Sequence, residues 1–273
     1  MSEIDKRHIV VVVPIYLPTF SKFETTALDQ CFKILSEYDI VIVKPKSLNL
    51  EWLKSFYPRM KTMSFDDACF SSIRSYNRLV LSEEFYLAFF DYQYMLIYQL
   101  DAYVFKDDLE MWANKGYDYI GAPWLPTERW LLRTSGRLYL KIEALYYFFR
   151  KRSFRHLRSL YYQIGNGGFS LRKIQKMIEI TRFYNDKIKD YLSDGSEFYP
   201  EDVFLQLELK KKFKLKKPTL SGAIRFSIEQ DPVWCFKYNK SQLPFGCHNW
   251  YNKEALLFWR RFINIRDYAL KES

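Results

Sequence analysis

The sequence predicts an α/β fold in which helices flank a parallel sheet. Two β-branched runs, 9–13 and 40–43, lead to Pro14 and Pro45, and the segment between them, 24–38, has apolar residues at helical spacing. Continuous apolar runs are typical of strands that are buried on both faces of a parallel sheet. This strand–helix–strand order predicts a right-handed crossover and a Rossmann-type sheet, with a ligand crevice outside the carboxyl ends of the strands.

The next elements continue the pattern. Helices are expected over 71–79 and 82–90, followed by a third apolar strand over 94–100 that ends at Asp101. Tyr16 and Lys44 follow the first two strands, so they are expected at the same rim as Asp101. A carboxylate at this rim costs free energy unless it is solvated, paired or bound to a metal. A cap for the next turn is the alternative explanation of Asp101.

Residues 126–162 differ in composition, because Trp, Leu, Tyr and Phe alternate with basic residues up to a basic run at 150–158. We interpret them as a basic aromatic helical insertion. Basic and aromatic side chains on helices suit an anionic membrane interface. The alternatives are an amphipathic helix pair on the sheet, or a surface for single-stranded nucleic acid, for which no RNA-binding motif is found. A C-terminal helix is expected over 252–273.

Composition limits the class of protein. The 273 residues suffice for one α/β domain, and 48% apolar with 27% charged residues exclude a disordered tail, a collagen-like fibre and a coiled coil. A net charge of +10 predicts anionic partners: nucleic acid, an anionic membrane or a phosphorylated substrate. Four widely spaced cysteines and no secretion signal predict a reduced, cytoplasmic protein. The longest apolar run is far below the roughly 20 residues of a membrane-spanning helix.

Two segments combine residue types that suit nucleotide binding. In 98–103, Asp101 ends a strand and can bind a divalent cation, as a nucleotide diphosphate requires. In 164–172, three of the nine glycines surround Asn166. Such a loop lets backbone N–H groups approach a ligand, and it also serves as a tight structural turn. Its spacing matches neither GxGxxG nor a Walker A loop.

Two further segments carry titratable side chains. Glu201 and Asp202 follow Pro200 at the start of an apolar helical pattern. A carboxylate there either caps the helix or acts as a general base toward a sugar hydroxyl. His248 lies in a Gly-containing loop at 243–250, where it is either structural or a metal ligand through neutral imidazole.

The order of these segments resembles the GT-A glycosyltransferases. The motifs are QLDAYVF at 99–105, YDYIGAPW at 117–124, GNGGFSLR at 165–172, PED at 200–202 and PFGCHNW at 244–250. Over roughly 9–251 they look more closely like a bacterial family assigned to the glycosyltransferases, long catalogued as a domain of unknown function and found in surface-polysaccharide gene clusters. The resemblance implies one GT-A-like domain over 1–273 with a mixed sheet. Its parts are a nucleotide-binding half at 8–125, the insertion at 126–162, an acceptor and catalytic half at 163–251 and the C-terminal helix at 252–273.

The resemblance also implies roles for individual residues. Asp101 matches the last acid of the DxD motif, whereas Gln99 replaces the first acid, so metal binding relies more on His248. The metal ligands expected are thus Asp101 and His248, for Mn²⁺ or Mg²⁺. Asp202 matches the catalytic base of inverting members, with Glu201 as the alternate. The residues expected to bind the nucleotide sugar are Pro14, Tyr16, Lys44, Arg74, Asn77, Gln99, Asp101, Asn166, Gly167 and Gly168.

The function expected is transfer of a sugar from a nucleotide-sugar donor, with UDP as the carrier, to a lipid-linked or surface glycan. The reaction is expected to be inverting and assisted by a divalent cation, in the cytoplasm or at the inner face of the membrane. One alternative is a metal-dependent nucleotidyltransferase or phosphohydrolase. The other is a nucleic-acid-binding module, which leaves Asp101, Glu201 and Asp202 unexplained. No oligomeric state is predicted.

Overall fold

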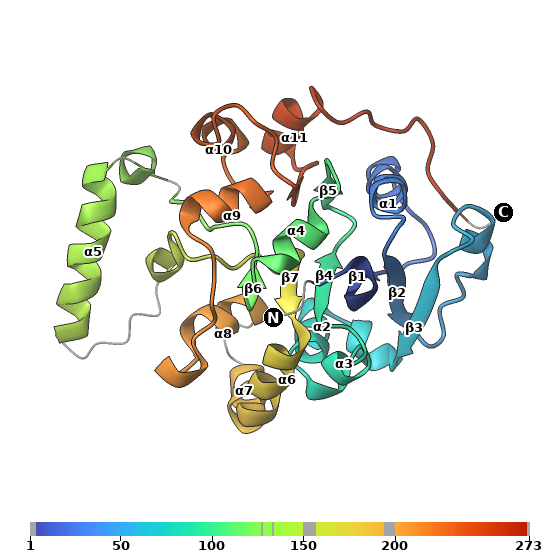
Figure 1. Cartoon of the computed structure of the whole chain (residues 1–273), viewed down its shortest axis with the longest axis horizontal. Coiled ribbons are helices and arrows are strands. Elements are labelled where there is room, and N and C mark those ends of the chain that lie inside the picture. Colours follow the sequence, from blue (N-terminus) through green and yellow to red (C-terminus); the bar gives the residue numbers. More distant parts are fainter. Residues whose placement is uncertain (1–3, 127, 133, 150–156, 194–199, 272–273) are drawn as a thin grey trace.

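The computed structural model describes residues 4–126, 128–132, 134–149, 157–193 and 200–271. Its centre is a six-stranded sheet of order β3-β2-β1-β4-β7-β6 (Figure 1). The strands are β1 (Ile9–Pro14), β2 (Asp39–Pro45), β3 (Lys61–Phe65), β4 (Tyr94–Tyr98), β6 (Tyr119–Ile120) and β7 (Phe169–Lys173). Strands β1 to β4 are parallel, as the apolar runs predict, and β7 runs antiparallel to β4 and β6. The sheet is therefore mixed, and the α/β fold class is confirmed.

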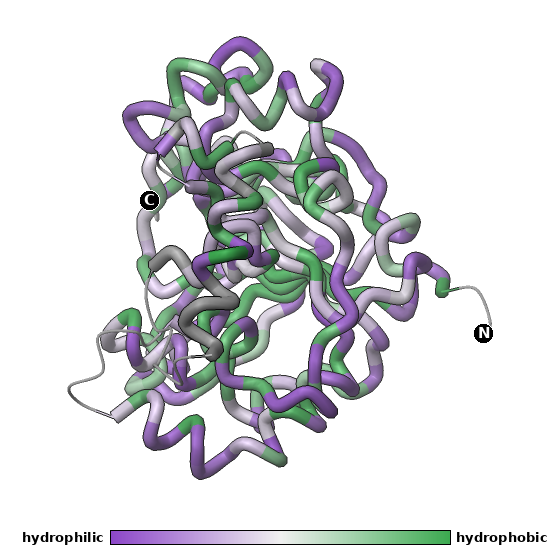
Figure 2. Tube along the Cα trace, turned by 90° about the vertical axis from the view of Figure 1, so that its left-hand side faces the viewer, coloured by the Kyte–Doolittle hydropathy of each residue, from purple (hydrophilic) through white to green (hydrophobic). Residues whose placement is uncertain are grey.

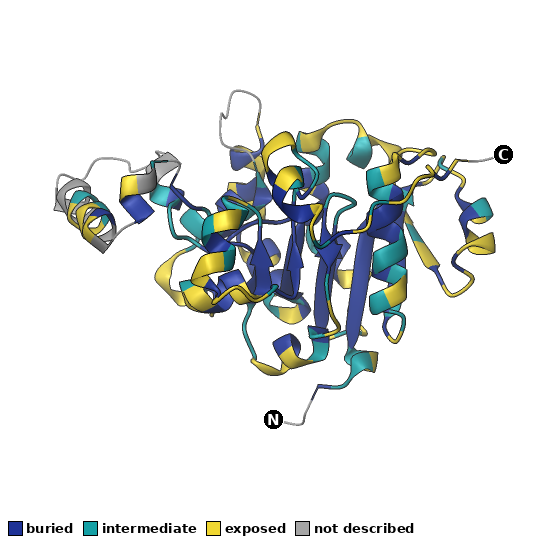
Figure 3. Cartoon of the chain, turned by 90° about the horizontal axis from the view of Figure 1, so that it is seen from above, coloured by how far each residue is buried: buried dark blue, intermediate teal, exposed yellow. Residues whose placement is uncertain are grey.

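Alternate residues of β1 enter two different hydrophobic layers. Val11 and Val13 pack with Leu28 of α1 (Lys22–Ile34), whereas Val10 and Val12 pack with Phe85 on the opposite face. Successive side chains of a strand point to opposite faces, so a strand of consecutive apolar residues needs helices on both sides. Strands β1, β4 and β7 are buried (Figure 3), and hydrophobic segments gather toward the middle of the molecule in Figure 2.

The remaining helices follow the sheet closely. They are α2 (Ile73–Val80), α3 (Glu83–Leu87), α4 (Leu109–Asn114), α5 (Thr134–Phe149), α6 (Ile174–Phe183), α7 (Asn185–Tyr191), α8 (Glu201–Leu207), α9 (Leu220–Phe226), α10 (Pro232–Tyr238) and α11 (Lys253–Trp259). The predicted helices at 71–79 and 82–90 correspond to α2 and α3 and begin later than expected. Ser72 and Ser82 are their N-caps, because each hydroxyl accepts a hydrogen bond from the backbone N–H three residues on.

A second, three-stranded sheet has the order β5-β9-β8. Its strands are β5 (Tyr103–Val104), β8 (Ser227–Ile228) and β9 (Gly246–Cys247). The central strand β9 is antiparallel to β5 and parallel to β8. This small sheet brings β5 beside two strands that lie more than 100 residues later in the chain.

The predicted C-terminal helix is wrong beyond Trp259, where α11 ends. The rest of the described chain lies along α1 instead. The backbone N–H of Leu270 donates to Thr25 Oγ1, and its carbonyl accepts from Phe20 N. These long-range hydrogen bonds satisfy backbone groups that a longer helix would have paired internally.

The described part of the insertion consists of 3₁₀ turns at Arg129–Leu132 and Leu157–Leu160 and helix α5. Helix α5 projects from the body of the molecule (Figures 1 and 3), and Leu138, Tyr139 and Ile142 on it are exposed. The basic residues at 150–156 lie outside the described residues. Among the helices that the structure describes, none is long and apolar enough to cross a membrane.

Candidate active site

A cleft of about 550 Å³ opens at the carboxyl ends of β1 and β4. Its lining includes Pro14 at the end of β1 and Tyr16 after it, Gln99 and Asp101 after β4, and Tyr76 on α2. The chain leaves β1 toward β2 and β3 and returns to β4 on the other side, so the cleft lies at the topological switch point of the sheet. This is where α/β sheets bind ligands.

The cleft has an unusual charge for a protein with +10 overall. Within the described ranges, its lining includes the acids Glu24 and Asp101 but no Lys or Arg. Any anionic ligand in this cleft therefore needs a positive partner other than a lysine or arginine side chain of the described lining.

Two basic residues predicted for the site lie elsewhere. The ammonium of Lys44 donates to the carbonyl of Leu48 (2.7 Å), in the turn that follows β2. The guanidinium of Arg74 donates to the carbonyl of Ser193 (2.5 Å), after α7. Neither residue lines the cleft, so the prediction that they contact the nucleotide is not supported by their positions. Each side chain instead donates to a backbone carbonyl outside the described cleft lining.

His248 lies between two carboxylates. Its Nε2 is 3.0 Å from Asp101 Oδ1, and its Nδ1 is 3.3 Å from Glu229 Oε1. Burial alone lowers the pKa of His248, but the charges and hydrogen bonds of Asp101 and Glu229 outweigh it and raise the pKa to about 10. Burial likewise raises the pKa of Asp101, and the facing His248 outweighs it and lowers the pKa below its ordinary value.

Gln99 adds a third possible metal ligand beside Asp101 Oδ1 and His248 Nε2. Gln99 Oε1 lies 3.4 Å from His248 Nε2, on the side where Asp101 also approaches. Separations near 3 Å are those of neighbouring ligands around a six-coordinate cation with bonds of about 2.1 Å. A carboxylate and an amide oxygen suit Mn²⁺ or Mg²⁺, and the imidazole favours Mn²⁺ of the two, because Mg²⁺ prefers oxygen ligands. No cluster of three or more His, Cys, Asp or Glu with metal-ligand geometry occurs in the described part of the chain, so Gln99 is needed to complete a three-ligand set.

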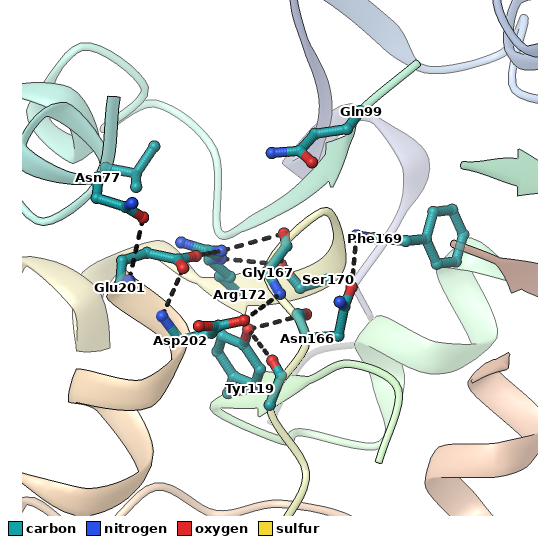
Figure 4. Close-up of polar contacts among 12 residues, drawn as sticks. Asn77, Gln99, Tyr119, Asn166, Gly167, Phe169, Ser170, Arg172, Glu201 and Asp202 are labelled. Atoms are coloured by element: carbon teal, nitrogen blue, oxygen red, sulfur yellow. Dashed lines mark hydrogen bonds and ion pairs between the residues drawn. The ribbon is translucent and has the colours of Figure 1, made fainter. Parts of the chain in front are cut away.

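The glycine loop supports these side chains by close packing. A Cβ atom on Gly168 would lie 2.0 Å from His248 Nε2 and 2.5 Å from Gln99 Oε1. A Cβ atom on Gly167 would lie 2.3 Å from Glu201 Oε1. Asn166 is buried, and its side chain accepts a hydrogen bond from Phe169 N (Figure 4). Glycine is therefore required at 167 and 168, because the side chains of His248, Gln99 and Glu201 contact the backbone of the loop.

Below the loop, Arg172 and Glu201 form a buried ion pair (Figure 4). Arg172 also donates to Ser170 Oγ (3.0 Å) and to Tyr86 Oη (2.9 Å). The other Glu201 oxygen accepts from the backbone N–H of Asp202. Oε1 of Glu201 thus links α8 to β7, and Oε2 is engaged within the first turn of α8.

Asn77 belongs to the same support. Its Oδ1 accepts from Glu201 N (3.1 Å), and its Nδ2 donates to Ile73 O (2.9 Å). It links α2 to the start of α8 and does not line the cleft.

Asp202 lies at the N-terminal turn of α8 and faces the loop (Figure 4). Its Oδ2 accepts from Gly167 N (3.2 Å) and its Oδ1 from Val203 N (2.8 Å). Burial, and then the nearby charges of Glu201 and Glu229, raise the pKa of Asp202 well above its ordinary value. A carboxyl group with a raised pKa suits proton transfer near neutral pH.

Sequence reasoning did not assign roles to Arg172 and Glu229. Arg172 stands in the apolar strand β7 with no exposed surface, and a lone arginine in such a run is itself a signal of a buried ionic partner. In the sequence, Glu229 follows Ile228 and cannot be distinguished from an ordinary surface acid. Only its contact with His248 across the small sheet distinguishes it, and the sequence does not show that contact.

A family model matches more than half of the chain. The profile of a family described as "Protein of unknown function (DUF5672)" matches residues 59–248. Among curated proteins, no significant match is found.

Solved structures of glycosyltransferases share the architecture. Galactosyltransferase LgtC in complex with donor and acceptor sugar analogs is 13% identical, with a TM-score of 0.51, over 94% of this chain and 98% of that one. Mouse xyloside xylosyltransferase 1 is 10% identical, with a TM-score of 0.51, over 89% and 96%. Glycosyltransferase GlyE of Streptococcus pneumoniae is 13% identical, with a TM-score of 0.52; the match covers 96% of this chain but only 58% of GlyE. The chain has the GT-A glycosyltransferase fold.

Proposed function

The chain belongs to the DUF5672 family, and we propose that it is a glycosyltransferase that uses a nucleotide-sugar donor and a divalent cation. One observation carries the proposal. The cleft at the switch point of the GT-A fold is lined by Asp101, whose carboxylate lies 3.0 Å from His248 Nε2. Gly168 packs on His248, and the N–H of the preceding Gly167 donates to Asp202. A donor cleft, a cation site and a candidate base are thus continuous.

The donor would occupy the cleft, with its diphosphate near Asp101. Gln99, Asp101 and His248 would hold the cation, which when bound supplies positive charge beside the diphosphate leaving group. This fits a cleft whose described lining offers no lysine or arginine.

Asp202 is the candidate general base. It would accept the proton of an acceptor hydroxyl while the hydroxyl oxygen bonds to the anomeric carbon and the bond from that carbon to the diphosphate oxygen breaks. A single displacement of this kind inverts the anomeric configuration. Glu201 is the less suitable base, because Arg172, Gly167 and the backbone of Asp202 surround its carboxylate.

The proposal includes a lipid-linked or surface glycan acceptor on the cytoplasmic side of a membrane. The support is a projecting helix α5 with exposed Leu138 and Ile142, followed in the sequence by a basic run. Apolar insertion together with basic charge is what peripheral binding to anionic lipid requires. All four cysteines are free thiols, which suits a reducing compartment.

This membrane role has its own test. The variant replaces Arg150, Lys151, Arg152 and Arg155 by Glu. We expect the wild type to sediment with vesicles that contain anionic lipid and the variant to stay in the supernatant. Equal sedimentation of the two proteins would reject the membrane role and leave the donor site untouched.

The proposed activity is tested by product analysis. The protein is incubated with a panel of UDP- and GDP-sugars and Mn²⁺, and the products are separated by chromatography and identified by mass. We expect free sugar and nucleoside diphosphate from slow transfer to water for one donor, with Asp202→Asn inactive and Asp186→Asn, on an exposed carboxylate, fully active. Nucleoside monophosphate with sugar phosphate would instead identify a phosphohydrolase, and no product from any donor would contradict the proposal.

A further inference from the structure

The small sheet places Glu229 where it can orient His248, and this arrangement rests on no sequence motif. We propose that Glu229 is a positioning residue: it fixes the ring of His248 so that Nε2 faces Asp101 and Gln99. This inference deepens the proposed function and rests on it, since His248 is there a ligand of the cation.

The three strands of the small sheet place Glu229, His248 and Asp101 side by side. Cys247 of β9 is paired with Ile228 of β8 in parallel register and with Tyr103 of β5 in antiparallel register. His248 follows β9, so Glu229, which follows β8, lies on one side of it. Asp101, which precedes β5, lies on the other side, and its carbonyl accepts from Trp250 N (3.2 Å).

The backbone of His248 is fixed as well. Its N–H donates to the carbonyl of Ile228 (3.0 Å), directly before Glu229. The side chain is 10% exposed, and Gly168 closes one side of the ring. A cation at Nε2 requires the neutral ring, so with main chain and ring position held in this way the remaining freedom is which nitrogen keeps its proton when the cation binds.

Glu229 determines that choice. A carboxylate 3.3 Å from Nδ1 favours the tautomer in which Nδ1 carries the hydrogen and donates it to Oε1. The lone pair of the neutral ring is then on Nε2, 3.0 Å from Asp101 Oδ1 and 3.4 Å from Gln99 Oε1. A carboxylate on the second ring nitrogen is the usual support of a metal-binding histidine.

The other contacts of Glu229 leave little room for a purely structural role. Its side chain is 14% exposed, and Oε2 is buried without a hydrogen-bond partner among the described residues. It forms no ion pair with a Lys or Arg of that part of the chain. A buried carboxylate costs free energy, and its one direct partner is the imidazole of His248.

The test measures cation binding directly. Mn²⁺ is titrated into the wild type, Glu229→Gln, Glu229→Leu and the control Glu254→Leu, an exposed acid on α11, by calorimetry in the presence of UDP. We expect Glu229→Leu to weaken Mn²⁺ binding about 10- to 100-fold. Glu229→Gln should stay within about threefold, because its amide oxygen still accepts from Nδ1–H, and Glu254→Leu should equal the wild type.

A second readout reports on the ring itself. Long-range ¹H–¹⁵N spectra of His-labelled protein with Mg²⁺ should show His248 as the Nδ1–H tautomer in the wild type and Glu229→Gln. In Glu229→Leu, which still gives a spectrum if its affinity is low, the Nε2–H form should appear. Only the loss of Glu229 as an acceptor, and not a general loosening, produces this exchange of tautomers.

The outcomes separate the two proposals. If the wild type binds Mn²⁺ and Asp101→Ala abolishes binding while Glu229→Leu changes neither affinity nor tautomer, the role of Glu229 is overturned and the proposed function stands. If the wild type binds no Mn²⁺, the proposed cation site fails, and the role of Glu229 fails with it.

Discussion

Replacing Arg172 by Met should destabilise the protein strongly, because it leaves the carboxylate of Glu201 buried without its cation. The Arg172 side chain has no exposed surface and that of Glu201 is 8% exposed, so solvent cannot replace the lost partner. Removing one member of a buried ion pair costs about 3–5 kcal/mol. The acceptor oxygens of Ser170 and Tyr86 lose their donor as well.

The double variant Arg172→Met/Glu201→Gln isolates the cost of the charge. With Gln in place of Glu201, no ionised carboxylate remains at this position. We expect the double variant to regain at least half of the free energy of unfolding that Arg172→Met loses. Arg182→Met is the matched control, since Arg182 pairs with Glu83 at the surface and its side chain is 67% exposed. It should change the stability far less than Arg172→Met.

Urea unfolding followed by tryptophan fluorescence gives the free energy of unfolding of each variant. A loss below about 1 kcal/mol for Arg172→Met would refute the reasoning, because that is the size of a solvent-screened pair. A double variant that is no more stable than Arg172→Met would also refute it, since the unpaired charge would then not be the cause.

Three further outcomes follow from the site. Gly168→Ala should lower Mn²⁺ affinity about tenfold or more while the fold persists, because the new Cβ displaces His248; calorimetry with unchanged affinity would contradict this. Asp202→Asn should raise the melting temperature at pH 8. Because the pKa of Asp202 is raised in the folded state, its carboxyl group contributes full stability below the unfolded pKa of about 4, and this contribution is lost as the pH rises through the folded pKa. Asn does not ionise, so it removes that loss. The gain should vanish near pH 4, and scanning calorimetry that shows an equal gain at both pH values would exclude this cause. Native protein at pH 8 should react with a thiol reagent rapidly at Cys69 alone, since the three other cysteines are buried; a second rapid thiol would show that this burial is wrong.

The sheet and the position of the cleft could be predicted because they depend on local patterns. The apolar runs of β1, β2 and β4 are long enough to show burial on both faces, and the chain order then places their carboxyl ends together. Asp101 follows from the same reasoning. The direction of the Lys44 side chain does not follow from it, because a long side chain at the rim can point several ways. In the structure its ammonium binds the carbonyl of Leu48.

The rest of the site depends on strand pairs and tertiary contacts that have no local sequence pattern. Strands β8 and β9 have two residues each, too few for a pattern, yet their register places Glu229 beside His248. The spacing of Leu256, Trp259 and Ile263 indicates a helix, but hydrogen bonds to α1 direct the chain after Trp259 away from it. Such contacts are tertiary and leave no local signal.

The most direct test of the central claim is calorimetric titration with UDP and GDP, each with and without Mn²⁺, on the wild type and on Asp101→Ala. A nucleotide-sugar site at the β1–β4 cleft predicts that one of the two nucleotides binds, that binding requires Mn²⁺, and that Asp101→Ala abolishes it. If neither nucleotide binds under any condition, or if binding depends on neither Mn²⁺ nor Asp101, the donor site has been wrongly assigned.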